Sequence, residues 1–212
     1  SEIFDPVLSF RGHASSRAGV AAFTTSTGYG IAKYDNPEEL SVSDRNNIGY
    51  QYTDCPLYWI SVIYLNFAEA KAEMGSLTQD DLNNSINKLQ ARAGLPAMTT
   101  TPDADPANNM GVSNLIWEIR RCRRCELIMD NWYRYWDLIR WHQLDKLDST
   151  KYPNTMLGAN VSNVPDCEEA TKNGYIDASD AQIRTYEAKH YFYPIPTTQL
   201  TLNKNMKQNP GW

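Results

Sequence analysis

The chain has 212 residues, enough for one domain or for one large part of a bigger protein. Hydrophobic residues make up 42%, which allows a packed core and excludes global disorder, and the net charge of −5 argues against nucleic acid as a partner. The longest mostly apolar run, Leu57–Ala68, is well short of the roughly 20 residues that a transmembrane helix needs.

Residues 1–54 are predicted to be irregular, because Gly, Ser, Thr and Asn are dense there and no helical period is sustained. Within them, Gly28–Tyr34 fits either a short strand or a surface loop.

A helical hairpin is predicted over residues 55–95. Pro56 fits the first turn of its first helix, and Gly75 fits the C′ position after that helix. One face of the first helix carries apolar residues at helical spacing, namely Ile60, Ile63, Tyr64, Phe67 and Ala68. Thr78 is the predicted N-cap of the second helix, with Asp81 as its capping-box partner.

The second helix is predicted to run to Ala93, with apolar residues at spacings of four, three and four, and to close at Gly94. Two helices joined by a few residues form an antiparallel hairpin. This hairpin resembles a tetratricopeptide-type unit, although one hairpin does not establish a repeat.

The sequence is organised around an arginine-rich stretch from Ser113 to Trp141, predicted to be one long helical run. Ser113 can cap its first turn. Apolar residues with arginines between them suit a helix that buries one stripe. The stripe consists of Leu115, Ile116, Ile119, Cys122, Leu127 and Ile128.

Residues 141–147 are predicted to continue for a helical turn or two, and residues 151–177 to be irregular, because Asn, Gly and Pro are frequent there. Residues 180–189 fit a short helix. The tail from Tyr191 contains two prolines, which exclude a helix at their positions, so the tail is predicted to lie extended.

Three segments, in order, resemble the SusD/RagB family of outer-membrane nutrient-binding lipoproteins. One is the hairpin LNFAEAKAEMGSLTQDDLNNSINKLQARAGLP, and another is the tail YFYPIPTTQLTLNKNMKQNPGW. The third is the arginine-rich stretch, where the family reads roughly RRERRVELAFEG, then an Arg, aromatics and W-D-L-x-R. The matching residues are Arg120, Arg121, Arg123, Arg124, Glu126, Leu127, Arg134, Trp136, Asp137, Leu138 and Arg140.

The chain departs from the family pattern within this stretch. Cys122 and Cys125 stand where the family has Glu and a small apolar residue, and Asp130 and Asn131 replace its Glu-Gly. One extra residue before Trp136 can be absorbed as a bulge or a break, so we expect a kink near Asn131.

The resemblance implies a mainly α fold class, with tetratricopeptide-like helical hairpins, long irregular loops and an extended C-terminal tail. Residues 1–212 would be the C-terminal region of such a protein. Its parts would be an irregular part (1–54), the hairpin (55–95), the arginine-rich helix (112–147) and an irregular, extended part (148–212). The family begins with a lipoprotein signal, a lipidated cysteine and a long helical half, which we expect to precede this sequence.

The Cys122-x-x-Cys125 pair is predicted to pack in the core or to remain a semi-buried thiol pair. Zinc ribbons need a second close pair, and Cys55 and Cys167 are lone residues. Two helical residues three apart are also poorly placed for a mutual disulfide. No metal and no cofactor are expected.

The four neighbouring arginines cover nearly every direction around the helix, so some of them must pack against protein. Carboxylates at Glu69, Glu73, Glu118 or Glu126 would satisfy them. The alternative is a site for phosphate or for a sulfated glycan.

No catalytic residue is predicted. Asp130 or Glu126 with Asp137 could act as a glycosidase pair only with carboxyls about 5.5 Å or about 6.5–9.5 Å apart, which sequence spacing cannot show. The resemblance places Glu126 and Asp137 in a structural helix. The histidines at 13, 142 and 190 show no metal or triad spacing.

If the ligand is a sugar, aromatic residues outside the helical stripes are the candidates for binding it. Pyranose rings stack on aromatic side chains, and polar side chains bond their hydroxyls. The candidates are Tyr29, Tyr34, Tyr50, Tyr52, Tyr152 and Tyr175. Packing within the loops is the alternative role for each of them.

The resemblance implies a surface-exposed, lipid-anchored glycan-binding protein of the outer membrane that works with a SusC-like TonB-dependent transporter in nutrient uptake. The membrane would be reached only through a lipid on the missing N-terminus, and the work would be capture without chemistry. One alternative is a helical-repeat module that binds protein or peptide and no glycan. A weaker alternative is a glycoside hydrolase fragment.

Overall fold

The computed structural model describes residues 27, 29, 57–130, 133–163, 171–179 and 182–212. The chain forms two compact units, which we call the helical unit (Asp54–Trp141) and the sheet unit (Ser1–Thr53 with His142–Trp212). The predictions for residues 1–54 lie outside the described residues, except at Thr27 and Tyr29.

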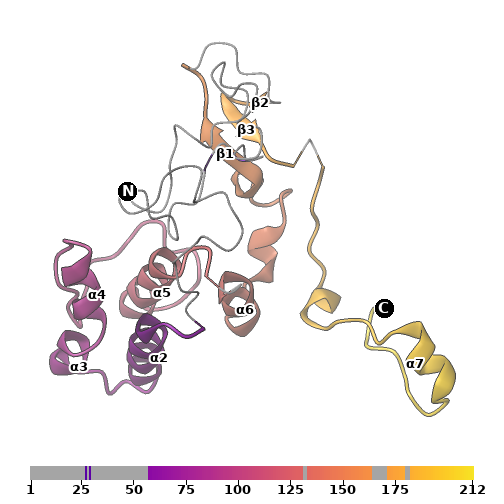
Figure 1. Cartoon of the computed structure of the whole chain (residues 1–212), viewed down its shortest axis with the longest axis horizontal. Helices are drawn as coiled ribbons and strands as arrows, with labels where there is room; N and C mark the ends of the chain where they lie inside the picture. Colours follow the sequence, from indigo (N-terminus) through magenta and orange to yellow (C-terminus); the bar gives the residue numbers. More distant parts are fainter. Residues whose placement is uncertain (1–26, 28, 30–56, 131–132, 164–170, 180–181) are drawn as a thin grey trace, which may run out of the picture. The chain divides into compact units, whose positions relative to one another are not determined.

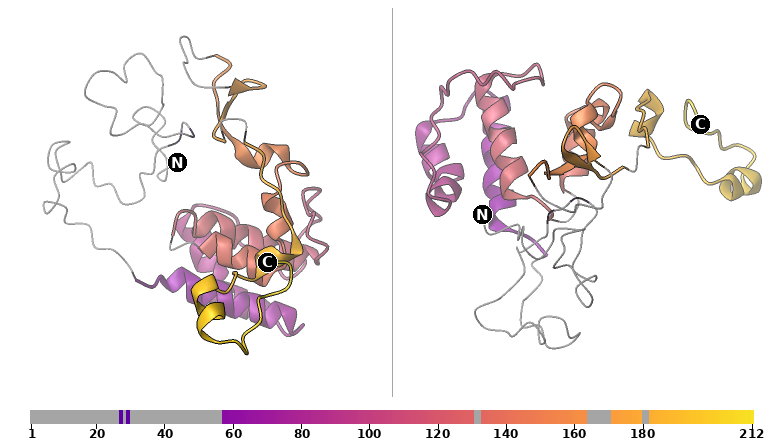
Figure 2. Two further views of the ribbon diagram at one scale, coloured as in Figure 1. Left: turned by 90° about the vertical axis from the view of Figure 1, so that its right-hand side faces the viewer. Right: turned by 90° about the horizontal axis from the view of Figure 1, so that it is seen from above.

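The described part of the helical unit is built from helices around one apolar core. They are α2 (Ile60–Glu73), α3 (Gln79–Asn83), α4 (Ile86–Arg92), α5 (Asn114–Glu126) and α6 (Tyr133–Arg140). Helices α2 and α5 lie side by side, with α3 and α4 next to them (Figures 1 and 2). The buried core consists of Leu65, Ala68, Leu82, Ile86, Leu89, Met98, Ile119 and Leu127. The predicted mainly α fold class is confirmed.

The predicted helix ends of the hairpin are largely confirmed. Thr78 and Asp81 form a reciprocal capping box, in which the Asp81 N–H donates to Thr78 Oγ1 (3.1 Å) and the Thr78 N–H donates to Asp81 Oδ2 (2.9 Å). Gly75 and Gly94 follow α2 and α4 with φ of +67° and +68°, the left-handed conformation that a helix C′ position requires.

The prediction for the buried face of α2 is correct for Ala68, which lies in the core, and for Tyr64, which packs against it, but wrong for Ile60, Ile63 and Phe67. The side chains of Ile60 and Ile63 are 62% and 58% exposed, whereas Leu65 and Ala68 are fully buried. The buried face also carries Glu69, because that carboxylate pairs with arginines of α5 and α6. Helix α2 begins at Ile60, so the prediction that Pro56 opens it is also wrong.

Two predicted continuous helices are each split. The second hairpin helix breaks between α3 and α4 at Ser85 (φ −131°, ψ −97°), whose hydroxyl donates to the Asp81 carbonyl (2.6 Å). The arginine-rich stretch breaks after α5, where Met129 adopts φ +64°, and resumes in α6. The deviation expected near Asn131 is therefore a break between two helices.

The sheet unit contains short elements. They are the 3₁₀ turns η2 (Leu144–Leu147), η3 (Pro153–Met156) and η4 (Ala188–Tyr191), the strands β1 (Leu157–Asn160), β2 (Thr171–Lys172) and β3 (Tyr175–Asp177), and the helix α7 (Thr197–Leu202). The strands form an antiparallel sheet in the order β1-β3-β2 (Figure 1), so the prediction that residues 151–177 are irregular is wrong.

The turn between β2 and β3 explains how the sheet forms. Asn173 and Gly174 have φ of +54° and +80°, and two residues with positive φ make the tight turn that joins antiparallel strands. The sheet covers a small core of Ala159, Val161 and Ile176. The Asn-Gly dipeptide was the sequence signal for this hairpin.

Thr27 lies against β1 at a place where only glycine fits. The Ala159 N–H donates to the Thr27 carbonyl (2.8 Å), and a Cβ at Gly158 would stand 2.2 Å from that oxygen. This contact places Thr27, and with it the neighbouring Tyr29, beside the sheet.

The C-terminal predictions are only partly correct. Residues 182–187 are not helical, and only the short turn η4 forms near the predicted helix 180–189. The tail is extended up to Pro196 and then forms α7, because Pro196 is the N-cap and the residues after it are free to be helical. Beyond α7 the tail folds back, and Trp212 Nε1 donates to the Phe192 carbonyl (3.0 Å).

Candidate functional site

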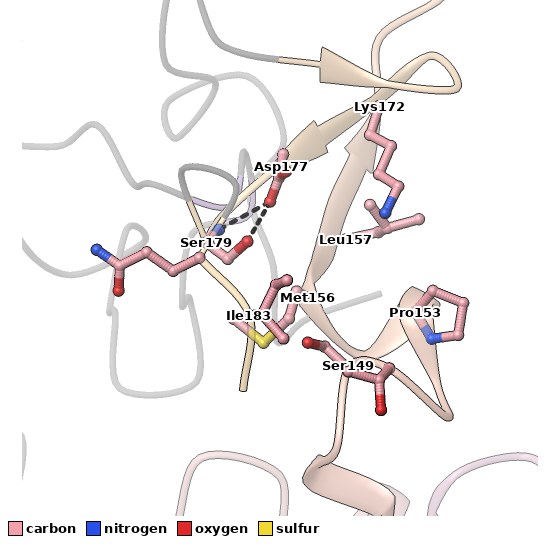
Figure 3. Close-up of a pocket in the computed structure, with 10 residues that line it drawn as sticks. Ser149, Pro153, Met156, Leu157, Lys172, Asp177, Ser179 and Ile183 are labelled. Atoms are coloured by element: carbon pink, nitrogen blue, oxygen red, sulfur yellow. Dashed lines mark hydrogen bonds between the residues drawn. The ribbon is translucent and has the colours of Figure 1, made fainter. Parts of the chain in front are cut away.

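A cavity of about 200 Å³ lies in the sheet unit, between the sheet and the segments around η3 and residues 182–183 (Figure 3). It is lined by Ser149, Thr150, Pro153, Met156, Leu157, Lys172, Asp177, Ser179, Gln182 and Ile183. These residues come from five separate pieces of chain, which the sheet and the 3₁₀ turns bring together. The lining combines apolar carbon with groups that donate and accept hydrogen bonds.

The register of the sheet determines which side chains face the cavity. Lys172 pairs with Tyr175 across β2 and β3, and Leu157 pairs with Asp177 across β1 and β3. Directly opposed residues share a face, and side chains alternate along a strand. Tyr175 therefore lies on the same face as Asp177, while Ile176, only 1% exposed, points to the opposite face.

The carboxylate of Asp177 is held in a fixed position. Its Oδ1 accepts hydrogen bonds from the backbone N–H (3.0 Å) and the hydroxyl (2.6 Å) of Ser179. Figure 3 shows this pair on one side of the cavity, and Lys172 reaching from β2 toward Leu157 on the other. A cation and an anion thus border the same small space.

Asp148 shapes the wall next to the cavity. Its carboxylate accepts hydrogen bonds from the hydroxyl and the N–H of Thr150 and from the N–H of Tyr186. The Thr150 hydroxyl is the largest influence that lowers the pKa of Asp148, which falls to about 2. Asp148 is therefore ionised at every ordinary pH, and the turn carrying Thr150 keeps its shape.

The predicted tyrosines have different surroundings. Tyr175 is 38% exposed on the cavity face of the sheet, and Tyr29 is 43% exposed beside β1. Tyr152 is half-buried: its hydroxyl accepts a hydrogen bond from Lys146 Nζ (2.8 Å), and the same ammonium lies 4.4 Å from the ring centroid. The remaining candidates, Tyr34, Tyr50 and Tyr52, lie outside the described residues.

None of the described tyrosines is among the cavity-lining residues, and the residues that do line it were not predicted. The predicted site residues are all aromatic. Lys172 and Asp177 come together only through the register of the strands.

Three of the four arginines of α5, namely Arg120, Arg121 and Arg123, pair with carboxylates, largely as predicted. Arg120 Nε donates to Glu69 Oε1 (3.0 Å), and Arg120 Nη2 contacts Glu73 (3.2 Å). Arg121 pairs with Glu118, as predicted, and Glu126 pairs with Arg92 outside the arginine cluster.

The buried partner of Arg123 was not predicted. Arg123 Nε donates to Asp137 Oδ2 (2.7 Å), and both side chains are almost fully buried. Arg140 also contacts Asp137 (3.4 Å). Asp137 is therefore an ion-pair partner within the helical scaffold. Among the described residues, no group of three His, Cys, Asp or Glu residues is placed to hold a metal ion.

The two described cysteines have contrasting surroundings. Cys122 packs against the core, and burial raises the pKa of its thiol to about 12, whereas Cys125 is exposed. Both thiols are free. The predicted packing is thus confirmed for Cys122 and wrong for Cys125.

We expect an aromatic disulfide reagent to modify Cys125 rapidly in the folded protein and Cys122 only after unfolding, because the thiolate is the reactive form. The test uses a background in which Cys55 and Cys167 are replaced by serine, with release of the coloured thiol as the readout. Cys125→Ser should abolish the fast phase, and a fast phase that persists in this variant would contradict the structure.

The fold and the ion pairs together define a class of protein: a helical hairpin packed on an arginine-rich helix, in which Arg120 and Arg123 pair with carboxylates of neighbouring helices. The family model described as the SusD family matches residues 12–212, and the chain belongs to this family. A comparison with curated proteins found no match.

Solved structures support the same fold. A SusD-like protein from Bacteroides fragilis NCTC 9343 is 25% identical, with a TM-score of 0.56 over 89% of this chain. The protein BT4246 is 24% identical, with a TM-score of 0.63 over 95% of this chain. The matches cover 31% and 30% of those two proteins, so the present chain spans about a third of their length.

Proposed function

We propose that this chain belongs to a cell-surface glycan-binding protein that works with a SusC-like TonB-dependent transporter in nutrient uptake. The observation that carries the proposal is the match to the SusD family over residues 12–212. SusD-like proteins are outer-membrane lipoproteins that bind polysaccharides. The proposal includes surface exposure in the outer membrane and anchoring of the whole protein by a lipid.

The chemistry of the sheet unit supports this role. Tyr175 offers an exposed ring on the cavity face, and the cavity beside it supplies apolar carbon together with hydroxyl, amide and charged groups. Sugars present an apolar ring face and a rim of hydroxyls, so they need this combination.

Among the described residues, no helix has both the length and the apolar composition needed to cross a bilayer.

The proposal is tested by electrophoresis in gels that contain one polysaccharide each, chosen from a broad panel, with a non-binding protein as the mobility standard. Retardation on at least one polysaccharide is expected. If neither gel retardation nor titration calorimetry detects any polysaccharide, glycan binding by this chain is contradicted.

We expect Tyr175→Ala to weaken binding to the retarding polysaccharide by roughly 1 kcal/mol, about fivefold, because a sugar would lose its stacking surface. The dissociation constant from gels of graded polysaccharide content gives the measurement. Tyr58→Ala is the matched control, since Tyr58 is 86% exposed on the helical unit and should leave the affinity unchanged. Equal affinities of the Tyr175 variant and the native chain would remove Tyr175 from the binding surface.

The second candidate function is a protein-interaction or peptide-binding module. The observation that favours it is an exposed apolar stripe on α2, where Ile60, Ile63 and Phe67 are 62%, 58% and 42% exposed. Apolar residues at this spacing suit packing against the apolar face of another helix. Binding of an amphipathic helical peptide that Ile63→Lys abolishes, with no retardation on any polysaccharide, would favour this candidate over glycan capture.

A further inference from the structure

The cavity beside the sheet is small for a ligand site. Its volume is about 200 Å³, whereas pockets for drug-sized ligands measure about 300–1,000 Å³. A space of this size accommodates one six-membered sugar ring. Its size therefore suits a single ring.

The lining matches the two surfaces of such a ring. Pro153, Met156 and Ile183 provide apolar carbon to the lining (Figure 3). Asp177 and Lys172 flank the space with groups that bond hydroxyls. A pyranose can place its apolar face on the carbon surface and direct its hydroxyls to the two charged groups.

Hydrogen bonds between the walls hold the cavity in shape. The Ser149 N–H donates to the Arg184 carbonyl (2.9 Å), and the Arg184 N–H donates to Ser149 Oγ (3.0 Å). The Thr155 hydroxyl donates to the Lys146 carbonyl (3.1 Å) and ties η3 to η2. A preformed site of this kind loses little entropy when a small ligand binds.

The same hydrogen bonds lie at one end of the cavity, where they join the chain around Ser149 to the chain at Arg184. The opposite end is bordered by Lys172, next to the exposed Tyr175. A glycan with one ring in the cavity can therefore continue toward Tyr175.

We propose that this cavity is a subsite for one neutral hexose of a glycan, with the next sugar lying toward Tyr175. The inference rests on the proposed glycan-binding function. Lys172 and Asp177 bring opposite charges of equal size, so a neutral sugar suits the site, and Asp177 disfavours a carboxylate or a sulfate.

The experiment measures competition on the polysaccharide that retards the native chain. D-glucose, D-galactose and D-mannose are added at millimolar concentration, with D-glucuronate as the charged comparison. At least one neutral hexose is expected to restore free mobility, and glucuronate at the same concentration is not. Saturation-transfer NMR on the same four sugars gives a direct measure of binding that does not depend on a polysaccharide.

Two variants address the cavity itself. Gln182→Trp fills the space from an exposed position, and Lys172→Ala removes one polar border. Each is expected to weaken hexose binding at least tenfold. Lys204→Ala, at an exposed position in the tail, is the matched control and should leave binding unchanged. Equal thermal melting curves for all three variants exclude unfolding as the cause.

The outcomes separate this inference from the proposed function. If a polysaccharide retards the chain while no hexose competes and Gln182→Trp leaves retardation intact, the subsite is overturned and glycan binding stands. If no polysaccharide retards the chain, hexose binding is judged from the saturation-transfer NMR alone. Absence of hexose binding in that measurement overturns the subsite as well.

Discussion

Replacing Asp137 with alanine is expected to destabilise the helical unit by about 3–5 kcal/mol, because removing one partner of a buried ion pair leaves the other charge uncompensated. Arg123 and Asp137 have side chains only 5% and 6% exposed, with 2.7 Å between Nε and Oδ2. In the variant, the partners that Arg123 would keep among the described residues are the Asn66 side-chain oxygen (2.8 Å) and the ring of Tyr133. Urea unfolding followed by circular dichroism gives the free-energy difference.

The matched control for Asp137→Ala is Arg121→Ala, which breaks the exposed pair with Glu118. Exposed pairs contribute about 0–1 kcal/mol, so this variant should unfold close to the native chain. The double variant Arg123→Met with Asp137→Leu should recover much of the lost stability, because no charge is then left buried. A cost below about 1 kcal/mol for Asp137→Ala would show that the pair is solvated.

Asp137 also tests the alternative that the chain is a glycoside hydrolase fragment. A catalytic Asp137 would lose turnover on substitution by asparagine and keep its stability. The observed contacts with Arg123 and Arg140 instead predict that Asp137→Asn lowers stability.

Replacing Glu69 with alanine is expected to have an effect of similar size, about 3–5 kcal/mol. The carboxylate is 3% exposed and accepts from Arg120 Nε (3.0 Å), Arg140 Nη2 (2.7 Å) and Trp141 Nε1 (2.7 Å). Its removal leaves the indole N–H and the largely buried Arg120 without this acceptor. Glu73→Ala is the control, since Glu73 is half exposed and, within the part of the chain that the structure describes, pairs with Arg120 alone, at 3.2 Å.

The charge of Glu69 also makes stability depend on pH. Burial raises the pKa of Glu69, but the hydrogen bonds and charges of Arg140 and Arg120, with the indole of Trp141, outweigh burial and leave the pKa below its usual value. A carboxylate with a lowered folded-state pKa stabilises the fold above its unfolded pKa of about 4.3 and loses this contribution as the pH falls further. Glu69→Gln should therefore flatten the fall in stability below pH 4.3 measured by urea unfolding, and an unchanged profile would contradict the prediction.

The sequence predicted the helical unit better than the sheet unit, for a physical reason. Caps are local, so the pair Thr78–Asp81 and the C′ residue Gly75 could be identified from their neighbours alone. The buried face of α2 depends instead on which distant side chains meet it. Ile60 and Ile63 fit an apolar helical stripe. The face that carries Glu69 is buried instead, because Glu69 pairs with Arg120 of α5.

The sheet escaped prediction because its strands are only two to four residues long, too short to show alternation. The candidate site could not be predicted for the same reason, because it depends on how these short strands pair. Tyr175 could be selected as an aromatic residue outside the helical stripes, but its position opposite Lys172 follows from the register. The roles proposed for Tyr34, Tyr50 and Tyr52 stay predictions.

The ion pairs of Glu69 have a consequence for how the chain reaches its folded state. Arg140 and Trp141 follow Glu69 by 71 and 72 residues. A chain that emerges N-terminus first, at about 5–20 residues per second during synthesis, presents α2 on the order of 4–14 s before these partners exist. Until then Glu69 has at most Arg120 of α5 as a partner, so the full set of contacts that buries this face must wait for Arg140 and Trp141. The helical unit thus gains much of its stability in one late step, and a chain truncated before α6 should remain exposed to proteases.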